Sequence, residues 1–264
     1  MASARQSDVK RHLGAVRLAA AASLVLAALA LSRTPAGADE VVRAAGGRGA
    51  AALAENASSA VRPAALQAGP QGRPLFGMDS EPVAAGGVTA KWRMIEEDIA
   101  REQEVLARCR KQAPCPAAAQ SVLHIVAEGS GHIGLARVGR INRAVDLAIA
   151  PASDRAQWGV EDHWSSPFET LQTGRGDCED YAIVKYLALL QAGLSPADVK
   201  IVILKNLAPA EDHAAVAARV DGAWLILDNR KLALVRDTAI VGAIPKFVLD
   251  ENGARRFLPS TRAG

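Results

Sequence analysis

The residues with the clearest capacity for chemistry in this 264-residue chain surround a single cysteine. Cys178 stands in the segment Gly-Asp-Cys-Glu-Asp-Tyr of residues 176–181, which joins a glycine-containing loop to an apolar run ending near Leu190. Asp177, followed three positions later by Asp180, resembles a capping box, so we expect a helix to begin here. Cys178 then lies in the first turn, where unpaired N–H groups and the helix dipole favour a thiolate nucleophile. The alternative is an ordinary buried cysteine.

A cysteine nucleophile needs a general base, and the spacing of a β-hairpin selects His213 for that role. Residues 213–220 and 223–228 are β-rich runs on either side of Asp221-Gly222, a strong signal for a two-residue hairpin turn. In that register Asp228 is a diagonal neighbour of His213 on the same face, roughly 7–8 Å away at the backbone, which the two side chains can bridge. An aspartate that accepts from the imidazole fixes its tautomer and stabilises the imidazolium. A slip of one residue would put Asp228 on the other face of the hairpin. The alternative is a surface histidine near an unrelated aspartate at the end of a strand.

The periodicity of apolar residues predicts the elements that must hold these side chains. Helical spacing predicts helices over residues 89–112, 117–127 and 132–149, a short one over 166–172, and the nucleophile's helix from Cys178 to Leu190. The later part of the chain has β periodicity, with strands expected over 199–204, 213–220 and 223–228. Helices first and antiparallel strands afterwards indicate an α+β fold, in which the helix that carries the nucleophile packs on the sheet.

The two ends of the chain are expected to lie outside the folded domain. Residues 1–38 contain five basic groups, an apolar run over 18–31 and small residues at 36–38, a combination typical of a secretory signal peptide. The run has about 14 residues, fewer than the roughly 20 that a membrane-spanning helix needs; an uncleaved anchor is the alternative. We therefore expect an exported protein with a flexible Ala/Gly/Pro-rich leader over 39–73, a folded domain over 74–258 and a tail over 259–264.

The distribution of charge argues against one class of function. Five of the 31 basic groups and one of the 28 acidic groups lie in residues 1–38, which leaves 26 basic and 27 acidic groups for the rest. A balanced chain without a basic stripe does not fit a protein that binds the phosphates of a nucleic acid.

Cysteine spacing predicts one disulfide and one free thiol. In an oxidising compartment two of the three cysteines can pair. Cys109 and Cys115 are six positions apart, which favours a local disulfide over two separate buried thiols. Cys178 then remains free in an exported protein, as a nucleophile requires.

Several of these motifs occur together in a known family. Residues 176–183, the strand that begins at His213 and the Leu-Asp-Asn of 227–229 resemble the bacterial transglutaminase-like cysteine peptidases. Upstream elements also fit the pattern of that family: Leu-Phe-Gly at 75–77, Trp-Gly at 158–159 and Asp-x-Trp-x-x-Pro-x-Glu at 162–169. The resemblance covers residues 74–250. His213 is followed by Ala-Ala-Val where relatives carry bulkier residues, so the substrate groove is expected to differ.

The resemblance implies a papain/transglutaminase-like fold and a catalytic triad of Cys178, His213 and Asp228. It also implies a calcium ion held by the carboxylates on either side of the nucleophile, Asp177 and Glu179, since carboxylate oxygens suit a hard cation. From the residues alone, a helix cap with ordinary first-turn acids is the alternative. No organic cofactor is expected.

The implied function is that of a periplasmic cysteine endopeptidase that cleaves a large cell-surface adhesin and so modulates biofilm attachment. The implied partners are that protein substrate and an inner-membrane cyclic-di-GMP receptor that controls the protease. Two alternatives use the same scaffold: an acyl transferase that passes the acyl group to an amine, and a non-catalytic protein-binding module.

Overall fold

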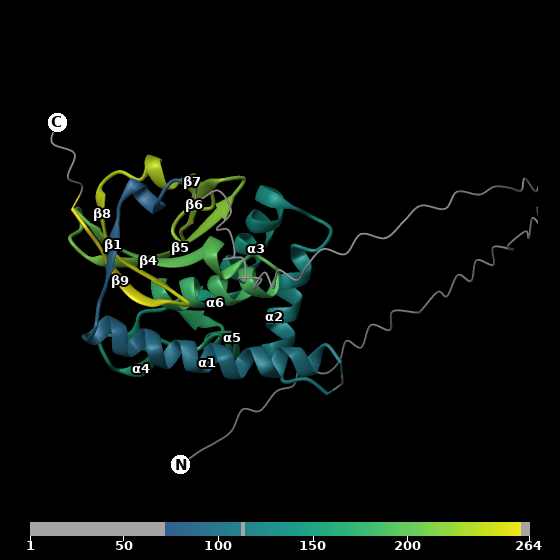
Figure 1. The fold of residues 1–264 in the computed structure, drawn as a ribbon. Helices are drawn as coiled ribbons and strands as arrows, with labels where there is room; N and C mark the ends of the chain where they lie inside the picture. Colours follow the sequence, from purple (N-terminus) through teal and green to yellow (C-terminus); the bar gives the residue numbers. More distant parts are fainter. Residues whose placement is uncertain (1–71, 112–113, 260–264) are drawn as a thin grey trace, which may run out of the picture. The chain divides into compact units, whose positions relative to one another are not determined.

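An antiparallel sheet and a group of helices share one buried core in this computed structural model, which describes residues 72–111 and 114–259 (Figure 1). Helices occupy the first part of this range and most strands the second, so the predicted α+β class is confirmed. The predicted signal peptide (1–38) and nearly all of the leader (39–73) and tail (259–264) lie outside the described residues. None of the described helices is both long and apolar enough to cross a membrane.

Of the six helices in the described residues, five lie where the sequence predicts them and α4 was not predicted. The helices are Gly87–Cys109 (α1), Ala117–Glu128 (α2), Gly134–Ala148 (α3), Asp154–Trp158 (α4), Pro167–Thr173 (α5) and Cys178–Gln191 (α6). α1 is amphipathic and buries a stripe that includes Trp92, Ile99 and Leu106. α6 lies between the sheet and the other helices, which explains why every residue from Asp180 to Leu189 is buried (Figure 1).

The sheet has seven strands in the order β1-β9-β8-β4-β5-β6-β7. Their bounds are Ser80–Pro82 (β1), Val199–Asn206 (β4), Asp212–Val220 (β5), Ala223–Leu227 (β6), Val235–Arg236 (β7), Ala243–Asp250 (β8) and Gly253–Phe257 (β9). The predicted hairpin register is confirmed, because Val220 pairs with Ala223. Both turn residues, Asp221 and Gly222, have positive φ (49° and 77°), as a type I′ turn requires.

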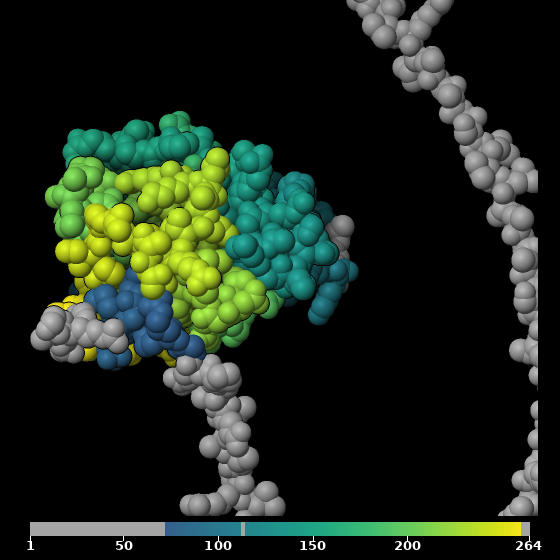
Figure 2. Space-filling model, turned by 90° about the horizontal axis from the view of Figure 1, so that it is seen from above, coloured from purple at the N-terminus to yellow at the C-terminus, as the bar shows by residue number. Residues whose placement is uncertain are grey.

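The face of the sheet opposite α6 has its own smaller core. The N-terminal segment around Leu75 packs there against Trp224 and Phe257, and the indole N–H of Trp224 donates to the carbonyl of Arg73 (3.1 Å). Because β1 pairs with β9, this segment also lies beside the C-terminal strands, blue against yellow in Figure 2. Both faces of the strands that carry the site residues are therefore covered.

The predicted disulfide is confirmed: Cys109 and Cys115 are bonded, and the bond joins the end of α1 to the segment before α2. Cys178 is free and partly buried.

Candidate active site

Crowded packing fixes the start of α6 and with it the position of Cys178. A Cβ atom added at Gly176 would lie 2.6 Å from the Cβ and Oδ2 atoms of Asp180. Asp180 accepts hydrogen bonds from the backbone N–H groups of Asp177 (3.3 Å) and Ser165 (2.9 Å), so the predicted capping box forms. Burial raises the pKa of the Asp180 carboxyl to about 7, although the N–H of Ser165 opposes the rise.

A second support comes from a two-stranded parallel ladder in front of α6. β2 (Ala150–Pro151) pairs with β3 (Arg175–Gly176), which ties the residues just before the nucleophile to the end of α3. The N–H of Ala152 extends this ladder by donating to the carbonyl of Gly176 (2.9 Å). Backbone hydrogen bonds to residues 150–152 thus hold the loop that leads into Cys178.

The hairpin brings together the histidine and the aspartate that the sequence paired. Nε2 of His213 lies 2.9 Å from Oδ1 of Asp228, and both residues are buried. The same carboxylate oxygen accepts the backbone N–H of Arg230 (2.9 Å). Burial alone would raise the pKa of Asp228, but the hydrogen bonds with His213 and Arg230 and the charge of His213 bring it below its ordinary value. Asp228 is therefore an ionised acceptor that orients the imidazole.

The helix α6, which begins at Cys178, packs on β5, which carries His213. The backbone N–H of Ala214, the residue after His213, acts to lower the pKa of the Cys178 thiol, against burial and the nearby carboxylates. The second ring nitrogen of His213, Nδ1, is buried and has no hydrogen-bond partner among the described residues. That nitrogen is therefore free to exchange a proton, while Nε2 is held by Asp228.

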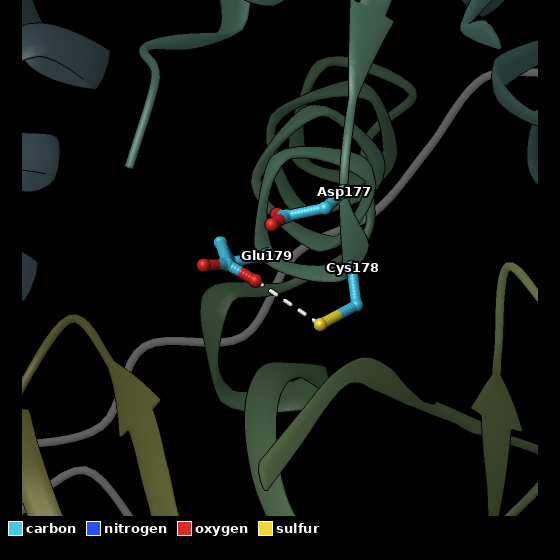
Figure 3. A group of neighbouring side chains, drawn as sticks. All are labelled: Asp177, Cys178 and Glu179. Carbon is cyan, nitrogen blue, oxygen red and sulfur yellow. Dashed lines mark hydrogen bonds between the residues drawn. The ribbon is translucent and has the colours of Figure 1, made fainter. Parts of the chain in front are cut away.

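The protonation state of Cys178 differs from the sequence-based expectation of a lowered thiol pKa. Burial raises the pKa of the thiol well above its ordinary value, and the nearby charges of Glu179 and Asp177 add to the rise. The sulfur lies 3.0 Å from Oε2 of Glu179, which accepts its hydrogen (Figure 3). The expectation was wrong because the helix dipole is outweighed by burial and by two carboxylates on the same side as the sulfur.

Those carboxylates belong to a larger acidic group. Oδ1 of Asp177 is buried without a hydrogen-bond partner among the described residues, and burial together with Glu179 raises the pKa of this carboxyl to about 8. Asp154 and Asp162 bring further carboxylate oxygens within 4.8 Å of Glu179. An unpaired buried oxygen among several carboxylates fits a hard divalent cation such as Ca²⁺. The capping box does not account for this oxygen, because Oδ1 of Asp177 has no hydrogen-bond partner among the described residues although the box is formed.

Sequence reasoning named Asp177 and Glu179 and missed Asp154 and Asp162. Asp162 belongs to the motif at 162–169, but nothing in its spacing relates it to residues near 178. Asp154 begins α4, the helix that was not predicted, and accepts the backbone N–H of His163 (2.5 Å). Their proximity to Glu179 follows only from the tertiary fold.

Comparison with models of protein families gives a match over half of the chain. The model of a family described as bacterial transglutaminase-like cysteine proteinase BTLCP matches residues 107–239, a range that contains Cys178, His213 and Asp228.

The individual relatives are more distant. LapG of Legionella pneumophila in its calcium-bound form superimposes with a TM-score of 0.48 and 20% identity, over 63% of this chain and 90% of that one. The EGTA-treated form of the same protein gives 0.47 and 19%, over 64% and 88%. The UPF0252 protein MJ1282 of Methanocaldococcus jannaschii is 31% identical over 71 residues, 26% of this chain. The match spans a fifth (20%) of the length of that curated relative.

Proposed function

The chain belongs to the bacterial transglutaminase-like cysteine proteinases, and we propose that it hydrolyses peptide bonds with Cys178 as nucleophile, His213 as base and Asp228 as orienting group. The observation that carries the proposal is the buried 2.9 Å contact between Asp228 and His213, which lies on the strand that packs against the helix of Cys178. The three side chains come from α6, β5 and the residue after β6, and each has the type that its proposed role requires.

Nδ1 of His213, which has no hydrogen-bond partner among the described residues, is the proposed acceptor of the thiol proton. The thiol gives its proton to Nδ1 of His213 while the sulfur attacks the carbonyl carbon of the substrate. The N–H of Cys178 lies in the first turn of α6, and we expect it to stabilise the resulting oxyanion. The imidazolium, held at Nε2 by Asp228, then protonates the departing amine as the C–N bond breaks. Water attacks the remaining thioester, and the same histidine takes up and returns the proton.

A calcium ion would be held by Asp177 and Glu179, with Asp154 and Asp162 as nearby further donors. When bound, it would offset the negative charges that raise the pKa of the thiol. The support within this chain is the unpaired buried oxygen of Asp177.

Membership of the family and the N-terminal sequence support a location and a substrate class. The apolar run in residues 18–31 favours export to the periplasm by a cleavable signal peptide. There, the proposed substrate is a large cell-surface adhesin whose cleavage releases cells from a biofilm. An inner-membrane cyclic-di-GMP receptor is the proposed regulator.

The direct test is cleavage of purified adhesin fragments by wild type and Cys178→Ala, with calcium and with a chelator. The proposal expects specific cleavage by the wild type alone, and faster cleavage with calcium. Equal cleavage by the two proteins would refute the assigned nucleophile. Products that carry an added amine in place of a free carboxylate would instead identify an acyl transferase, and mass spectrometry distinguishes the two.

A further inference from the structure

An ion pair at the surface joins the two segments that carry the histidine and the aspartate of the triad. Nη1 of Arg230 lies 2.6 Å from Oε1 of Glu211, and the two side chains are 47% and 41% exposed. Glu211 precedes His213 by two residues, and Arg230 follows Asp228 by two. Exposed ion pairs add little to the free energy of unfolding, so the importance of this pair lies in the segments that it joins.

At one end of the pair, the backbone of Arg230 is bonded to the carboxylate of Asp228. Oδ1 of Asp228 accepts the backbone N–H of Arg230 (2.9 Å), and the carbonyl of Asp228 accepts the N–H of Lys231 (3.1 Å). This is an Asx turn, in which the side chain of an aspartate bonds the backbone two residues later. The course of residues 228–231 and the orientation of the Asp228 carboxylate are therefore fixed together. A movement of this turn would move the carboxylate that orients His213.

At the other end, the backbone of Glu211 is bonded to the neighbouring strand. The carbonyl of Glu211 accepts the N–H of Asn206, the last residue of β4 (2.9 Å). β5 begins at the next residue, Asp212. The carboxylate of Asp212 is paired with Lys246 (2.7 Å), so it does not compete with Glu211 for the guanidinium. Glu211 is thus a fixed anchor at the start of the strand that carries His213.

Together these contacts close a ring that includes both residues of the dyad. Nε2 of His213 lies 2.9 Å from Oδ1 of Asp228, and the same oxygen is bonded to the backbone of Arg230. The side chain of Arg230 then returns to Glu211, two residues before His213. Lys231 also approaches Asp228, but its Nζ atom is 4.0 Å from Oδ2, beyond hydrogen-bonding distance. The ion pair is the link of this ring that joins the turn at 228–231 to the segment before β5.

We propose that Glu211 and Arg230 are positioning residues of the triad: their ion pair holds the turn at residues 228–231 against the start of β5 and so keeps Asp228 within hydrogen-bonding distance of His213. Both side chains act only through Asp228. This inference rests on the proposed function, because it presupposes the orienting role of Asp228.

A cycle of variants separates this role from a structural one. Arg230→Met and Glu211→Met each remove one side of the ion pair and keep the backbone bonds of both residues, and the double variant removes both sides. The exchanged variant Glu211→Arg/Arg230→Glu restores an ion pair with its charges reversed. Arg256→Met breaks another exposed pair, with Glu81, on strands that β8 and β4 separate from β5, and is the matched control. The readouts are the Tm, kcat and KM for a cleaved fragment, and the rate of Cys178 alkylation by iodoacetamide against pH.

We expect each single variant to lose about fivefold in kcat with little change in KM, since Asp228 holds the imidazole less firmly. The alkylation profile should move to higher pH, because a less stabilised imidazolium supports less thiolate. The double variant should be no slower than the single variants, since all three lack the same contact. The exchanged variant should recover most of the kcat and the wild-type pH profile. Arg256→Met should match wild type, and the Tm of every variant should stay close to the wild-type value.

An unchanged kcat or an unshifted pH profile in either single variant would overturn the proposal. So would losses that multiply in the double variant, or an exchanged variant no faster than the double variant. A raised KM at unchanged kcat would also overturn it, because the pair would then bind the substrate. A wild type that neither cleaves the fragments nor alkylates readily would refute the proposed function and this inference with it, whereas the other outcomes refute the inference alone.

Discussion

At the scale of single residues, burial and neighbouring charge decide the state of Cys178. The helix N-terminus favours the thiolate, but burial and the carboxylate of Glu179, 3.0 Å from the sulfur, favour the thiol and prevail. The same carboxylate is a candidate calcium ligand. If calcium binds as proposed, removing the charge of Glu179 should lower the pKa of the thiol as the bound ion would.

Glu179→Gln makes this testable, because Cys178 is the one thiol of a three-cysteine chain whose other two cysteines are bonded. In a calcium chelator at pH 8, we expect iodoacetamide to alkylate the variant about tenfold faster than wild type, since one unit of thiol pKa changes the thiolate fraction up to tenfold. Calcium should accelerate the wild type and change the variant little. Glu104→Gln, an exposed glutamate of α1, is the control and should match wild type. Equal rates for wild type and Glu179→Gln in chelator would contradict the assigned role.

Glu102, outside the candidate active site, is a second acidic group whose pKa is raised by burial. Its Oε1 accepts the N–H of Phe168 at the start of α5 (3.1 Å), and its Oε2 is buried without a partner among the described residues. Burial raises the pKa of this carboxyl to about 7, although Ser166 and Phe168 oppose the rise. Because the folded pKa exceeds the unfolded value, the folded state binds more protons between these two pKa values. Stability therefore falls as pH rises through about 7.

The Glu102→Gln variant has no charge at this position at any pH, so its stability should not fall as pH rises through about 7. We expect the Tm of the variant to match wild type at pH 5 and to exceed it by a few degrees at pH 8, which corresponds to about 1–3 kcal/mol. Thermal unfolding at the two pH values measures the difference. Parallel curves of Tm against pH for the two proteins would show that the Glu102 carboxylate does not cause the loss of stability at higher pH.

At the scale of elements, the start of α6 depends on the absence of a side chain at Gly176. Gly176→Ala would place a Cβ 2.6 Å from atoms of Asp180 and displace the capping box that holds the helix start. We expect a loss of about 1–3 kcal/mol in unfolding free energy and a larger loss in kcat than the folded fraction explains, because the nucleophile moves with the cap. Gly87→Ala at the start of α1 meets nothing within 4 Å and serves as the control, with wild-type activity. Wild-type kcat in Gly176→Ala would contradict this account.

The elements also show what local sequence can predict. Turn chemistry at Asp221-Gly222 determined the register of one hairpin, and with it the pairing of His213 and Asp228. Capping signals at Ser166 and Asp177 placed the beginnings of α5 and α6. In each case the decisive interactions lie within a few residues or within one hairpin.

The features that the sequence did not predict depend on contacts between distant residues. β1 was not predicted, because it pairs with β9 in a register that joins Ser80 to Phe257, 177 residues later. The Asn-Gly pair at 252–253 favours a turn, but the β8–β9 hairpin that it joins was not predicted. The predicted direction of the shift in the thiol pKa was wrong, since no local pattern indicates that Cys178 is buried against Glu179.

At the scale of the whole molecule, the two cores on either face of the sheet hold α6 and the hairpin in register. The disulfide lies at the far end of α1, outside the group of residues that forms the site. It closes a loop with a sequence separation of six, for which loop entropy predicts a stabilisation of about 2 kcal/mol.

The double variant Cys109→Ala/Cys115→Ala is therefore expected to lose several degrees in Tm and to keep its kcat below the melting transition. Comparison of thermal unfolding and of cleavage at 25 °C measures the two effects separately. A loss of kcat in the folded double variant would show that this bond also positions the site.

The central claim is that the thiol of Cys178 and the imidazole of His213 act as one unit. Its most direct measurement is the rate at which iodoacetamide alkylates Cys178 at pH 6 with calcium present, in wild type and in His213→Asn. At that pH an isolated thiol is almost entirely protonated, so Cys178 reacts readily only if His213 takes up its proton. We predict that His213→Asn lowers the rate about tenfold or more. Equal rates in the two proteins would contradict the triad.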